Sequence, residues 1–534
     1  MRRIIQLLVM LAFLALIEIM IREVHPEPRV GKLTVELVDA DTGETKPGII
    51  RLSDELDKSS ELILELMVRG LGVDKHGPIH EWYVLPQKST LELKAGRYTL
   101  SALHGIETER AEQTVTIEHG KTTELRLPLK RFYNAASHGL YSGNTHLHLM
   151  KLPRVEADRY LVDIPQADGL DVLFVSHLER VDADRDYVTN QYSREDLQKL
   201  GERGVPIGNG EEHRHNFAGW GQGYGHVMLL DLHQLIHPAS IGPGIMKTGT
   251  DGRPLQIGID EARAQGSAII WCHDQWGYED IPNRISGRLQ ATNIFDGGTH
   301  GSYQHSFYRF LNAGFHVPFS TGTDWFMYDF SRVYLPAKAR PTPREFLDVL
   351  VTGQTFITNG PLFELSVDGH AIGTTVELKQ SGQVKIVAKC VGRCDFERLE
   401  LVRNGVVIEQ VKSQAEGGHF VASIDKSIDV SGPCWFAART PPPPVKGFAD
   451  LQTPVNKNEL GNDLFGHTSA VYVDVAGRHL FDLPTAEGLL AEMSEHRRII
   501  ADQAKFADDT ERQRVLRVYD DAISRWKTRI EQER

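Results

Sequence analysis

The sequence lacks an excess of basic residues, and this absence excludes one large class of partners. Its 534 residues include 59 lysines and arginines against 72 aspartates and glutamates, which gives a formal net charge of −13. A phosphate backbone needs a basic surface, so nucleic acid is not expected as a main partner. A small anionic substrate stays compatible with this charge, because a bound metal can reverse the local field.

Cysteine is scarce, and several familiar catalytic motifs are missing. There are four cysteines and no C-x-x-C pair; Cys272 lies in an apolar run and is expected to be a packed thiol. After export, Cys434 could pair with Cys390 or with Cys394, and the sequence does not choose between them. No G-x-S-x-G, P-loop or G-x-G-x-x-G stands in a suitable strand–turn–helix setting, so serine-hydrolase and nucleotide-binding functions lack support.

The N-terminus has the pattern of a targeting segment. Arg2 and Arg3 precede an apolar run from Ile4 to Met20, so residues 1–24 are predicted to be a secretory signal peptide or a signal-anchor. No A-x-A-like cleavage site precedes Arg22, so removal and retention as a membrane attachment both remain open. We expect an exported protein, periplasmic or extracellular.

Two regions have the alternation of β-strands. Residues 30–130 contain short alternating segments such as Lys32 to Val38, separated by turn signals, and are expected to form a β-sandwich domain. Residues 362–477 alternate again, with an Asn404-Gly405 hairpin signal, and are expected to form a second β-sandwich domain. Residues 483–534 have helical periodicity and predict a helical tail of two helices that breaks near Asp508.

The region between these two, residues 131–361, has a different texture. Continuous apolar runs recur at Val172 to Val175, Val227 to Leu230 and Ala268 to Trp271, with helix-like stretches between them. This pattern is typical of a parallel sheet buried on both faces, either open or closed as a barrel. In such α/β folds the chemistry gathers at the carboxyl ends of the strands.

Histidine is concentrated in this middle region, which holds thirteen of the 23 histidines of the chain. His146 and His148 stand at i and i+2, so on a strand both imidazoles point to one side. Further candidate ligands lie at strand ends or loop junctions along the same region: Glu212, His226, His273 and Asp324. One or two such residues would be unremarkable, but a candidate at every step of the chain indicates a shared site.

Imidazole and carboxylate ligands together suit zinc, manganese or iron. A carboxylate can bridge two cations, and two neighbouring cations can lower the pKa of a bridging water so that it is hydroxide at neutral pH. The residue types therefore predict a site for divalent metal ions, and a bridging carboxylate would allow it to hold two.

The ordered set resembles the PHP (polymerase and histidinol phosphatase) superfamily. The segment Gly353 to Pro361, which reads G-x-T-F-x-T-N-G-P, leads into L-x-V-D-G from Leu365 to Gly369. This segment is similar to the carbaryl-hydrolase-like (CehA/McbA) branch of that superfamily, over residues 131–477. The resemblance implies an α/β fold: a distorted βα barrel flanked by N-terminal and C-terminal β-sandwich domains, with the helical tail.

The resemblance also implies a role for each candidate ligand. His146 and His148 would bind the first metal with Asp324, and His226 and His273 would bind the second. Glu212 would bridge the two, because the family's glutamate falls two residues after a glycine, here Gly210. Its neighbour Glu211 is the less favoured carboxylate.

The sequence also departs from the family pattern. Ser176-His177 stands where many members have Asp-His, Phe326 ends a motif that elsewhere ends in histidine, and Arg154 replaces a ligand of three-metal members. We therefore expect two metals, with His177 as proton donor or substrate contact and Arg154 as a clamp for an anionic group. Asp274 is expected to orient a ligand or act as a base.

The leading hypothesis is thus a binuclear metal-dependent hydrolase that acts on a small-molecule ester, carbamate or phosphoester. The alternative is an exported glycan- or protein-binding protein whose metal site is structural and catalyses no turnover. The missing acidic neighbour of His177 and the absent terminal histidine, replaced by Phe326, keep this alternative open. The two hypotheses differ in the site itself, because structural sites are closed whereas catalytic ones keep an open position.

Overall fold

A computed structural model describes residues 29–54, 63, 65–74, 77–217, 223–244, 249–273, 277–298, 301–445 and 451–534. The targeting segment expected over residues 1–24 lies outside the described residues, and so does Asp274. Within the described part of the chain, no helix is both long enough and apolar enough to cross a membrane.

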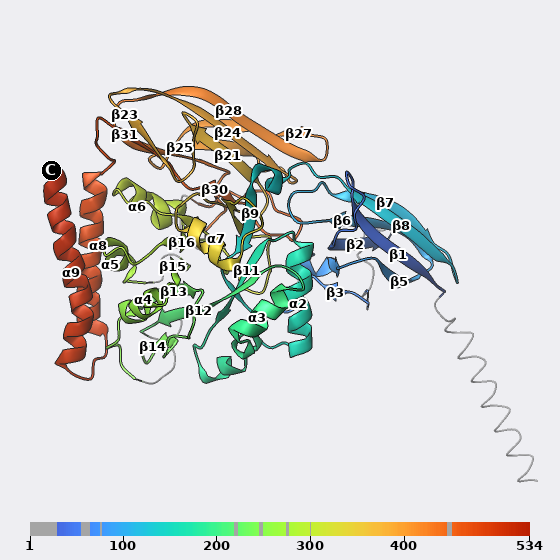
Figure 1. Cartoon of the computed structure of the whole chain (residues 1–534), viewed down its shortest axis with the longest axis horizontal. Helices are drawn as coiled ribbons and strands as arrows, with labels where there is room; N and C mark the ends of the chain where they lie inside the picture. The colour runs from blue at the N-terminus through green and yellow to red at the C-terminus, as the bar shows by residue number, and fades with distance from the viewer. Residues whose placement is uncertain are drawn as a thin grey trace, which may run out of the picture.

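The N-terminal part consists of two small sheets that share one core. The first sheet contains β1 (Val30–Asp39), β5 (Ser89–Lys94) and β8 (Thr122–Leu129). The second contains β2 (Gly48–Asp54), β3 (Met67–Val68), β4 (Tyr83–Leu85), β6 (Gly96–Leu103) and β7 (Ala111–Ile117). Alternate apolar side chains of both sheets, such as Leu33 and Leu100, are buried in the common core. These sheets lie at the opposite end of the molecule from the C-terminal helices (Figure 1).

A sixteen-stranded sheet runs through the rest of the molecule. Thirteen strands follow one another across it in this order: β17 (Phe319–Ser320), β16 (Ala291–Asn293), β15 (Ala268–Trp271), β13 (Gly225–Leu230), β12 (Ile207–His215), β11 (Val172–His177), β9 (Leu140–Asn144), β19 (Arg332–Pro336), β20 (Phe356–Thr358), β30 (Gly466–Thr468), β29 (Cys434–Arg439), β25 (Arg398–Arg403) and β26 (Val406–Lys412). Three more strands attach to this path: β14 (Ser240–Ile241), β23 (Thr375–Leu378) and β31 (Val471–Val475).

The expected α/β fold with a distorted βα barrel between two sandwich domains is wrong. The strands follow an open path. This path does not stop at residue 361, where the barrel was expected to end, because β20 pairs with β30 from the following region. Strand outweighs helix, at 36% against 25% of the residues. The sheet mixes parallel pairs such as β11–β12 with antiparallel pairs such as β12–β13. The apolar runs indicated strands buried on both faces, but burial does not determine strand direction. The segment between His215 and Gly225 is too short for the crossover that a parallel pair needs, so β12 and β13 pair antiparallel.

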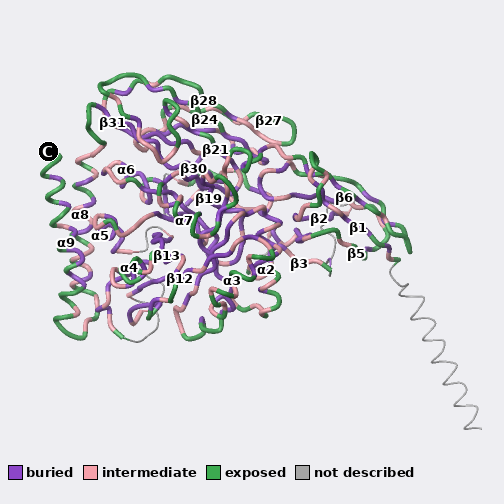
Figure 2. The backbone as a smooth tube through the Cα atoms, viewed as in Figure 1, coloured by how far each residue is buried: buried purple, intermediate pink, exposed green. Residues whose placement is uncertain are grey.

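The remaining strands form two further sheets. One has five strands: β22 (His370–Ala371), β21 (Leu362–Val367), β24 (Gly382–Gly392), β28 (His419–Val430) and β27 (Gln414–Glu416). The other pairs β10 (Leu147–His148) with β18 (Asp324–Trp325). The central strands are buried over most of their length, whereas β27 is exposed throughout and β7, β8 and β28 have several exposed residues (Figure 2).

Helices cover the large sheet and one end of the molecule. The shorter ones are α2 (Arg154–Ala167), α3 (Arg194–Gly201), α4 (Leu255–Ala264), α5 (Asp280–Ile285), α6 (Arg309–Asn312) and α7 (Pro343–Leu350). Ser193 and Thr342 begin α3 and α7 with capping boxes, which satisfy backbone N–H groups that the first turn leaves unpaired.

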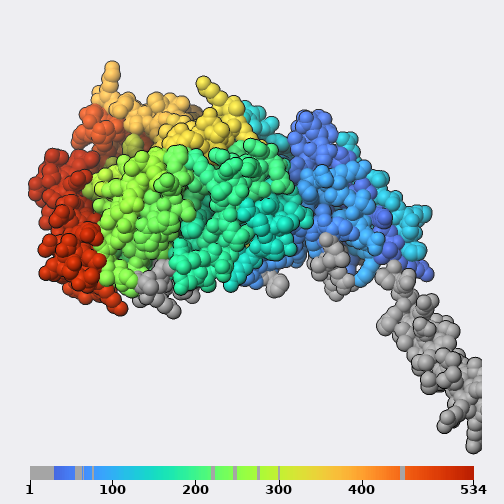
Figure 3. All heavy atoms as spheres, turned by 60° about the horizontal axis from the view of Figure 1, so that its bottom comes forward, coloured from blue at the N-terminus to red at the C-terminus, as the bar shows by residue number. Residues whose placement is uncertain are grey.

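The chain ends in a pair of helices, α8 (Leu483–Gln503) and α9 (Asp509–Glu533). Asp508 caps α9 by accepting a hydrogen bond from the Glu511 backbone N–H. The two helices stand side by side at one end of the molecule, where they pack against the middle region (Figures 1 and 3). Their buried positions include Tyr519 and Trp526, so the pair contributes to the main core.

The four cysteines are free thiols in this structure, with Cys272, Cys390 and Cys434 buried. The division of the chain into domains and the pairing of Cys434 with Cys390 or Cys394 remain predictions.

Candidate metal centre

The structure brings the six predicted ligand side chains together at one place. These residues are His146, His148, Glu212, His226, His273 and Asp324. Five of them are buried, and the His273 side chain is 11% exposed. They come from five strands or strand ends: β10, β12, β13, the end of β15, and β18.

The pairing of β10 with β18 positions three of the six. Leu147 stands opposite Asp324 in this parallel ladder, and the backbone N–H of Asp324 donates to the His146 carbonyl at 2.8 Å. The Nε2 atoms of His146 and His148 lie 2.9 Å apart, so both imidazoles point to the same side, as the i, i+2 spacing predicts. Asp324 Oδ1 lies 3.4 Å from the His146 Nε2 atom and 3.6 Å from the His148 Nε2 atom.

Glu212 lies on β12 and turns its two carboxylate oxygens toward two different pairs of imidazoles. Oε2 is 3.2 Å from His148 Nε2 and 3.9 Å from His146 Nε2. Oε1 is 3.4 Å from His226 Nδ1 and 3.5 Å from His273 Nε2. A carboxylate placed between two sets of nitrogen ligands has the arrangement that bridging requires.

Strand alternation separates Glu212 from its neighbour Glu211. Glu211 accepts a hydrogen bond from the Ile236 backbone N–H at 2.8 Å, and its Oε1 atom lies 3.2 Å from His213 Nδ1. Successive side chains on a strand point to opposite faces, so Glu211 contacts different residues from Glu212.

Asp296 and Ser176 contact three of the imidazoles through the ring nitrogens that face away from the cluster. His146 Nδ1 lies 2.7 Å from Asp296 Oδ2, and His148 Nδ1 lies 2.8 Å from the Ser176 carbonyl oxygen. His273 Nδ1 lies 3.1 Å from the Asp296 carbonyl oxygen. Donation from Nδ1 to these acceptors would leave the Nε2 lone pair of each ring facing the cluster, which is the tautomer a metal ligand needs.

The charges around the cluster favour the ionised forms of the Glu212 and Asp296 carboxylates. Burial raises the pKa of Glu212, but Arg214 and the imidazoles outweigh it and hold that pKa well below its ordinary value. Burial also raises the pKa of Asp296, and His273 with His146 outweighs it in the same way. For His226, burial and Arg214 both lower the pKa, so this imidazole is neutral.

Several residues around the cluster have backbone conformations that side chains disfavour. His273, Phe295 and Asp324 have φ of 53°, 61° and 55°. Left-handed conformations cost free energy for residues other than glycine and concentrate at functional sites. Here they turn the chain at strand ends so that His273 and Asp324 face the cluster.

The donor set fits divalent metal ions. Within the described residues, two overlapping groups place one ligand atom of each member within 4.8 Å of the others: His146 with Glu212, His273 and Asp324, and His146 with Cys272, His273 and Asp296. Asp324 Oδ1 and His226 Nδ1 are buried without a hydrogen-bond partner among the described residues. Buried polar atoms without partners are rare unless something else satisfies them, and a cation in the cluster would do so.

The three residues predicted for catalysis are placed differently. Arg154 begins α2 and donates to Asp158 Oδ1 at 3.0 Å, and its guanidinium carbon lies 3.7 Å from the centre of the Tyr192 ring; among the described residues, these contacts lie outside the cluster. His177 ends β11, where its Nε2 atom is 3.9 Å from Glu179 Oε2. Asp274 lies outside the described residues.

A cavity of about 800 Å³ adjoins the cluster. Its lining includes Met150, Phe295, Trp325 and Phe326, each within two positions of a cluster residue or of Asp296. The lining also includes Arg180, which the sequence reasoning did not single out. Aromatic and aliphatic side chains thus stand beside charged ones such as Asp329 and Lys457, a mixed lining that suits a small molecule with apolar and charged parts.

Sequence reasoning also missed Asp296 and Arg214, which contact the cluster directly. Asp296 follows strand β16, at the same kind of strand end that flagged the other candidates. Arg214 stands two positions after Glu212 on β12 and donates to its Oε1 atom at 3.1 Å. The i, i+2 rule that was applied to His146 and His148 would have found Arg214.

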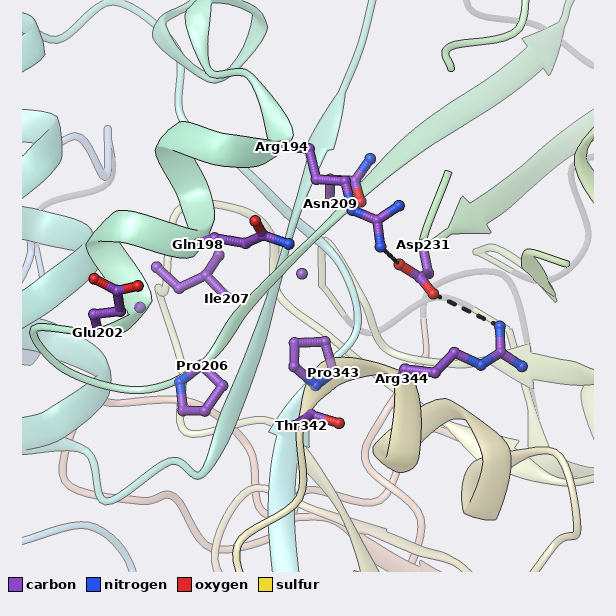
Figure 4. Close-up of a pocket in the computed structure, with 12 residues that line it drawn as sticks. Arg194, Gln198, Glu202, Pro206, Ile207, Asn209, Asp231, Thr342, Pro343 and Arg344 are labelled. Carbon is purple, nitrogen blue, oxygen red and sulfur yellow. Dashed lines mark hydrogen bonds and ion pairs between the residues drawn. The ribbon is translucent and has the colours of Figure 1, made fainter. Parts of the chain in front are cut away.

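A second cavity, of about 490 Å³, lies at the opposite end of β12 (Figure 4). Its two arginines both face Asp231: Arg194 at 2.7 Å and Arg344 at 3.7 Å. Neither metal-binding group identified above contributes to its lining. The chemistry is therefore assigned to the cluster and the cavity beside it.

No protein-family model and no curated protein matches this chain. Among solved structures, the minor pilin of Streptococcus agalactiae matches 20% of this chain at 18% identity and a TM-score of 0.16, and the match spans about half of that pilin (46%). The C-terminal domain of the shaft pilin spaA from Lactobacillus rhamnosus GG matches 19% of this chain and 98% of its own, at 12% identity and a TM-score of 0.12. A β-glucuronidase of Bacteroides uniformis matches 84% of this chain and 64% of its own, at 11% identity and a TM-score of 0.15. TM-scores this low support no conclusion on fold or function.

Proposed function

We propose that this protein is a metal-dependent hydrolase that acts on an ester, carbamate or phosphoester bond of a small molecule. The observation that carries the proposal is the orientation of Glu212, whose two oxygens face separate pairs of imidazoles. The ligand set and the resemblance to the carbaryl-hydrolase-like branch of the PHP superfamily support the same chemistry.

The chain's own residues would hold the metals and position the substrate. His146, His148 and Asp324 would hold one divalent ion, His226 and His273 the other, and Glu212 would contact both; zinc, manganese and iron suit these ligands. When bound, such ions supply a water molecule acidic enough to be hydroxide at neutral pH.

Other residues would support the reaction without binding metal. Asp296 and the Ser176 carbonyl fix the imidazole rings, and Arg214 fixes Glu212. His177, at the end of β11, is the candidate for moving protons. The apolar walls of the adjoining cavity would exclude bulk water from the bond that breaks.

We further propose that the protein is exported, to the periplasm or the extracellular space, through the segment of residues 1–24. Its charge pattern, two arginines followed by an apolar run, supports this.

The test is metal content and activity measured together. In Asp324→Asn and His146→Ala, metal content and hydrolysis of aryl ester, carbamate and phosphoester substrates should both be lost. Asn is the better substitution at 324, because it tolerates the positive φ there. His138→Ala, at an exposed histidine outside the cluster, should keep both properties. Full activity in either cluster variant would refute the assignment.

One observation favours a second candidate, an exported glycan- or protein-binding protein with a structural metal. Five of the six ligand residues are buried, and structural metal sites are closed. Purified protein that contains its metals but turns over no compound of the panel, while binding a glycan or protein, would favour this candidate.

A further inference from the structure

The cavity beside the cluster contains one arginine that the proposed function does not use. Arg180 follows strand β11, and its side chain is 13% exposed. Its Nε atom donates to Asp184 Oδ2 at 2.7 Å, and one terminal nitrogen donates to Asp184 Oδ1 at 3.1 Å and to the Tyr187 hydroxyl at 2.6 Å. This fork fixes the plane of the guanidinium before any ligand arrives, so little side-chain entropy is lost on binding.

A row of rings connects Arg180 to the cluster. Its guanidinium carbon lies 4.5 Å from the centre of the Trp325 ring, and that ring lies 5.3 Å from the His148 ring. Trp325 directly follows the predicted ligand Asp324. The arginine therefore stands about one aromatic ring away from the place where a bond would be broken.

The electrostatic environment agrees with this position. Burial lowers the pKa of Arg180, but Asp184 and, further away, Glu212 outweigh burial and raise it. The guanidinium is thus a permanent positive charge within the field of the cluster.

The other charged side chains of the cavity are paired or exposed, and Arg180 is itself paired with Asp184. Asp329 accepts hydrogen bonds from Asn359 and Asn458, at 2.9 Å and 2.6 Å. Lys457 pairs with Asp463 at 3.0 Å, on a side chain that is 59% exposed. Asp74, also in the lining, is exposed. Among the described lining residues, Arg180 is thus the more enclosed cation, with a side chain 13% exposed against 59% for Lys457.

We propose that Arg180 determines substrate specificity by binding an anionic group of the substrate, about one aromatic ring away from the bond that is hydrolysed. The proposal rests on the proposed function and narrows its substrate class to esters, carbamates or phosphoesters that carry a second, negatively charged group. An aromatic spacer between the two groups fits the Phe295 and Trp325 walls.

The proposal assigns to Arg180 the role that the sequence suggested for Arg154. The two residues form a matched pair: each donates to an aspartate four positions later, and each guanidinium lies over an aromatic ring. Only Arg180 lines the cavity. A third arginine, Arg159 on α2, is 52% exposed and pairs with Asp163, and serves as a neutral control.

The experiment compares two esters that differ by one charge, phenyl acetate and 4-carboxyphenyl acetate, on metal-loaded full-length protein. Arg180→Met should raise KM for the carboxylated ester about tenfold or more with little change in kcat, and leave KM for phenyl acetate within about twofold. Arg180→Lys should restore part of the difference. Arg159→Met should behave as wild type, with metal content and thermal midpoint checked for every variant.

Two results would overturn the proposal. One is an equal change in KM for both esters in Arg180→Met; the other is a selective effect in Arg154→Met, which would return the anion site to that residue. Calorimetric titration with benzoate separates this proposal from the proposed function, because it needs no turnover. Benzoate binding that weakens about tenfold in Arg180→Met supports the anion site even if neither ester is hydrolysed, whereas binding unchanged in that variant refutes it.

Discussion

At the scale of single residues, the cluster is preorganised by the groups that contact the imidazole nitrogens facing away from it. Asp296 is central here, because its carboxylate lies against His146 and its backbone carbonyl against His273. Asn293 in turn donates to Asp296 Oδ2 at 3.1 Å and fixes the carboxylate. Such outer partners hold the ring orientation and raise the basicity of the ligand nitrogen.

Asp296→Asn should therefore weaken metal binding about 10- to 100-fold without unfolding the protein. The amide keeps the shape of the side chain but removes the negative charge that faces His146 Nδ1. Metal affinity is measured by titration of the stripped protein against a chelator of known affinity. Asp171→Asn is the control, since Asp171 accepts from the Ser142 backbone at 2.8 Å and belongs to neither metal-binding group. Equal affinity in the Asp296 variant and the wild type would contradict the role assigned to Asp296.

The site residues that could be predicted from the sequence are those whose chemistry is unusual at their position. Two imidazoles at i and i+2, or an acid closing an apolar run, stand out from the surrounding composition. Asp296 did not stand out, because an aspartate after a short strand is also an ordinary turn residue. Arg180 was missed because its role depends on Trp325, a residue far away in sequence that only the fold brings next to it.

At the scale of elements, the close approach of β10 and β18 builds half of the cluster. Gly322 lies just before β18, where a Cβ atom would come within 2.6 Å of both the His146 Cβ and the His146 backbone nitrogen. Asn144 reinforces the contact, accepting from the His146 backbone N–H at 3.0 Å and donating to the Thr323 hydroxyl at 2.9 Å. A glycine is thus required here by space rather than by φ.

Gly322→Ala should push the two strands apart and lower metal affinity about tenfold or more. Contacts below 3.0 Å against backbone cannot be relieved by rotating a side chain, and overpacking of this kind typically costs about 1–3 kcal/mol. Metal titration and thermal unfolding are compared with Gly432→Ala, a glycine whose added Cβ would meet nothing within 4 Å. Undiminished metal binding in Gly322→Ala would show that the ladder does not set the ligand geometry.

Element type was more predictable than element arrangement. The apolar positions after Thr485 lie in α8 and α9, with Asp508 as the cap between them, because periodicity and capping are local signals. The runs at Val172, Val227 and Ala268 are strands, but their order and direction depend on partners far along the chain. That dependence is why the barrel expectation failed, and why the pairing of β20 with β30 could not be read from either segment alone.

At the scale of the whole molecule, one buried ion pair connects the N-terminal sheets to the middle region. Arg69, next to β3, donates to both carboxylate oxygens of Asp168, the residue that ends α2, and also to the Met327 carbonyl. Both charged side chains are 0% exposed. Gly72, three positions after Arg69, abuts the Phe326 ring, so this pair also holds one wall of the cavity beside the cluster.

Arg69→Met should destabilise the protein by about 3–5 kcal/mol, because it leaves the Asp168 carboxylate buried without its cation. Adding Asp168→Leu should recover most of that loss, since replacing a buried pair by apolar side chains is often neutral. The free energy of unfolding is taken from urea titrations of the full chain. Arg126→Met is the matched control: Arg126 is 60% exposed, lies 3.7 Å from Glu36, and should contribute less than about 1 kcal/mol.

The double variant also separates the two roles of the pair. If Arg69 and Asp168 only stabilise the fold, the stable double variant should keep wild-type KM values. If they also position the cavity wall formed by Gly72 and Phe326, KM should stay raised although stability is restored. Small displacements of lining residues impair substrate positioning even where they cost little stability. We expect KM to stay raised. Both variants lose the hydrogen bond that Arg69 donates to the Met327 carbonyl, and restoring stability does not replace it. Wild-type KM in the double variant would limit the N-terminal sheets to a structural role.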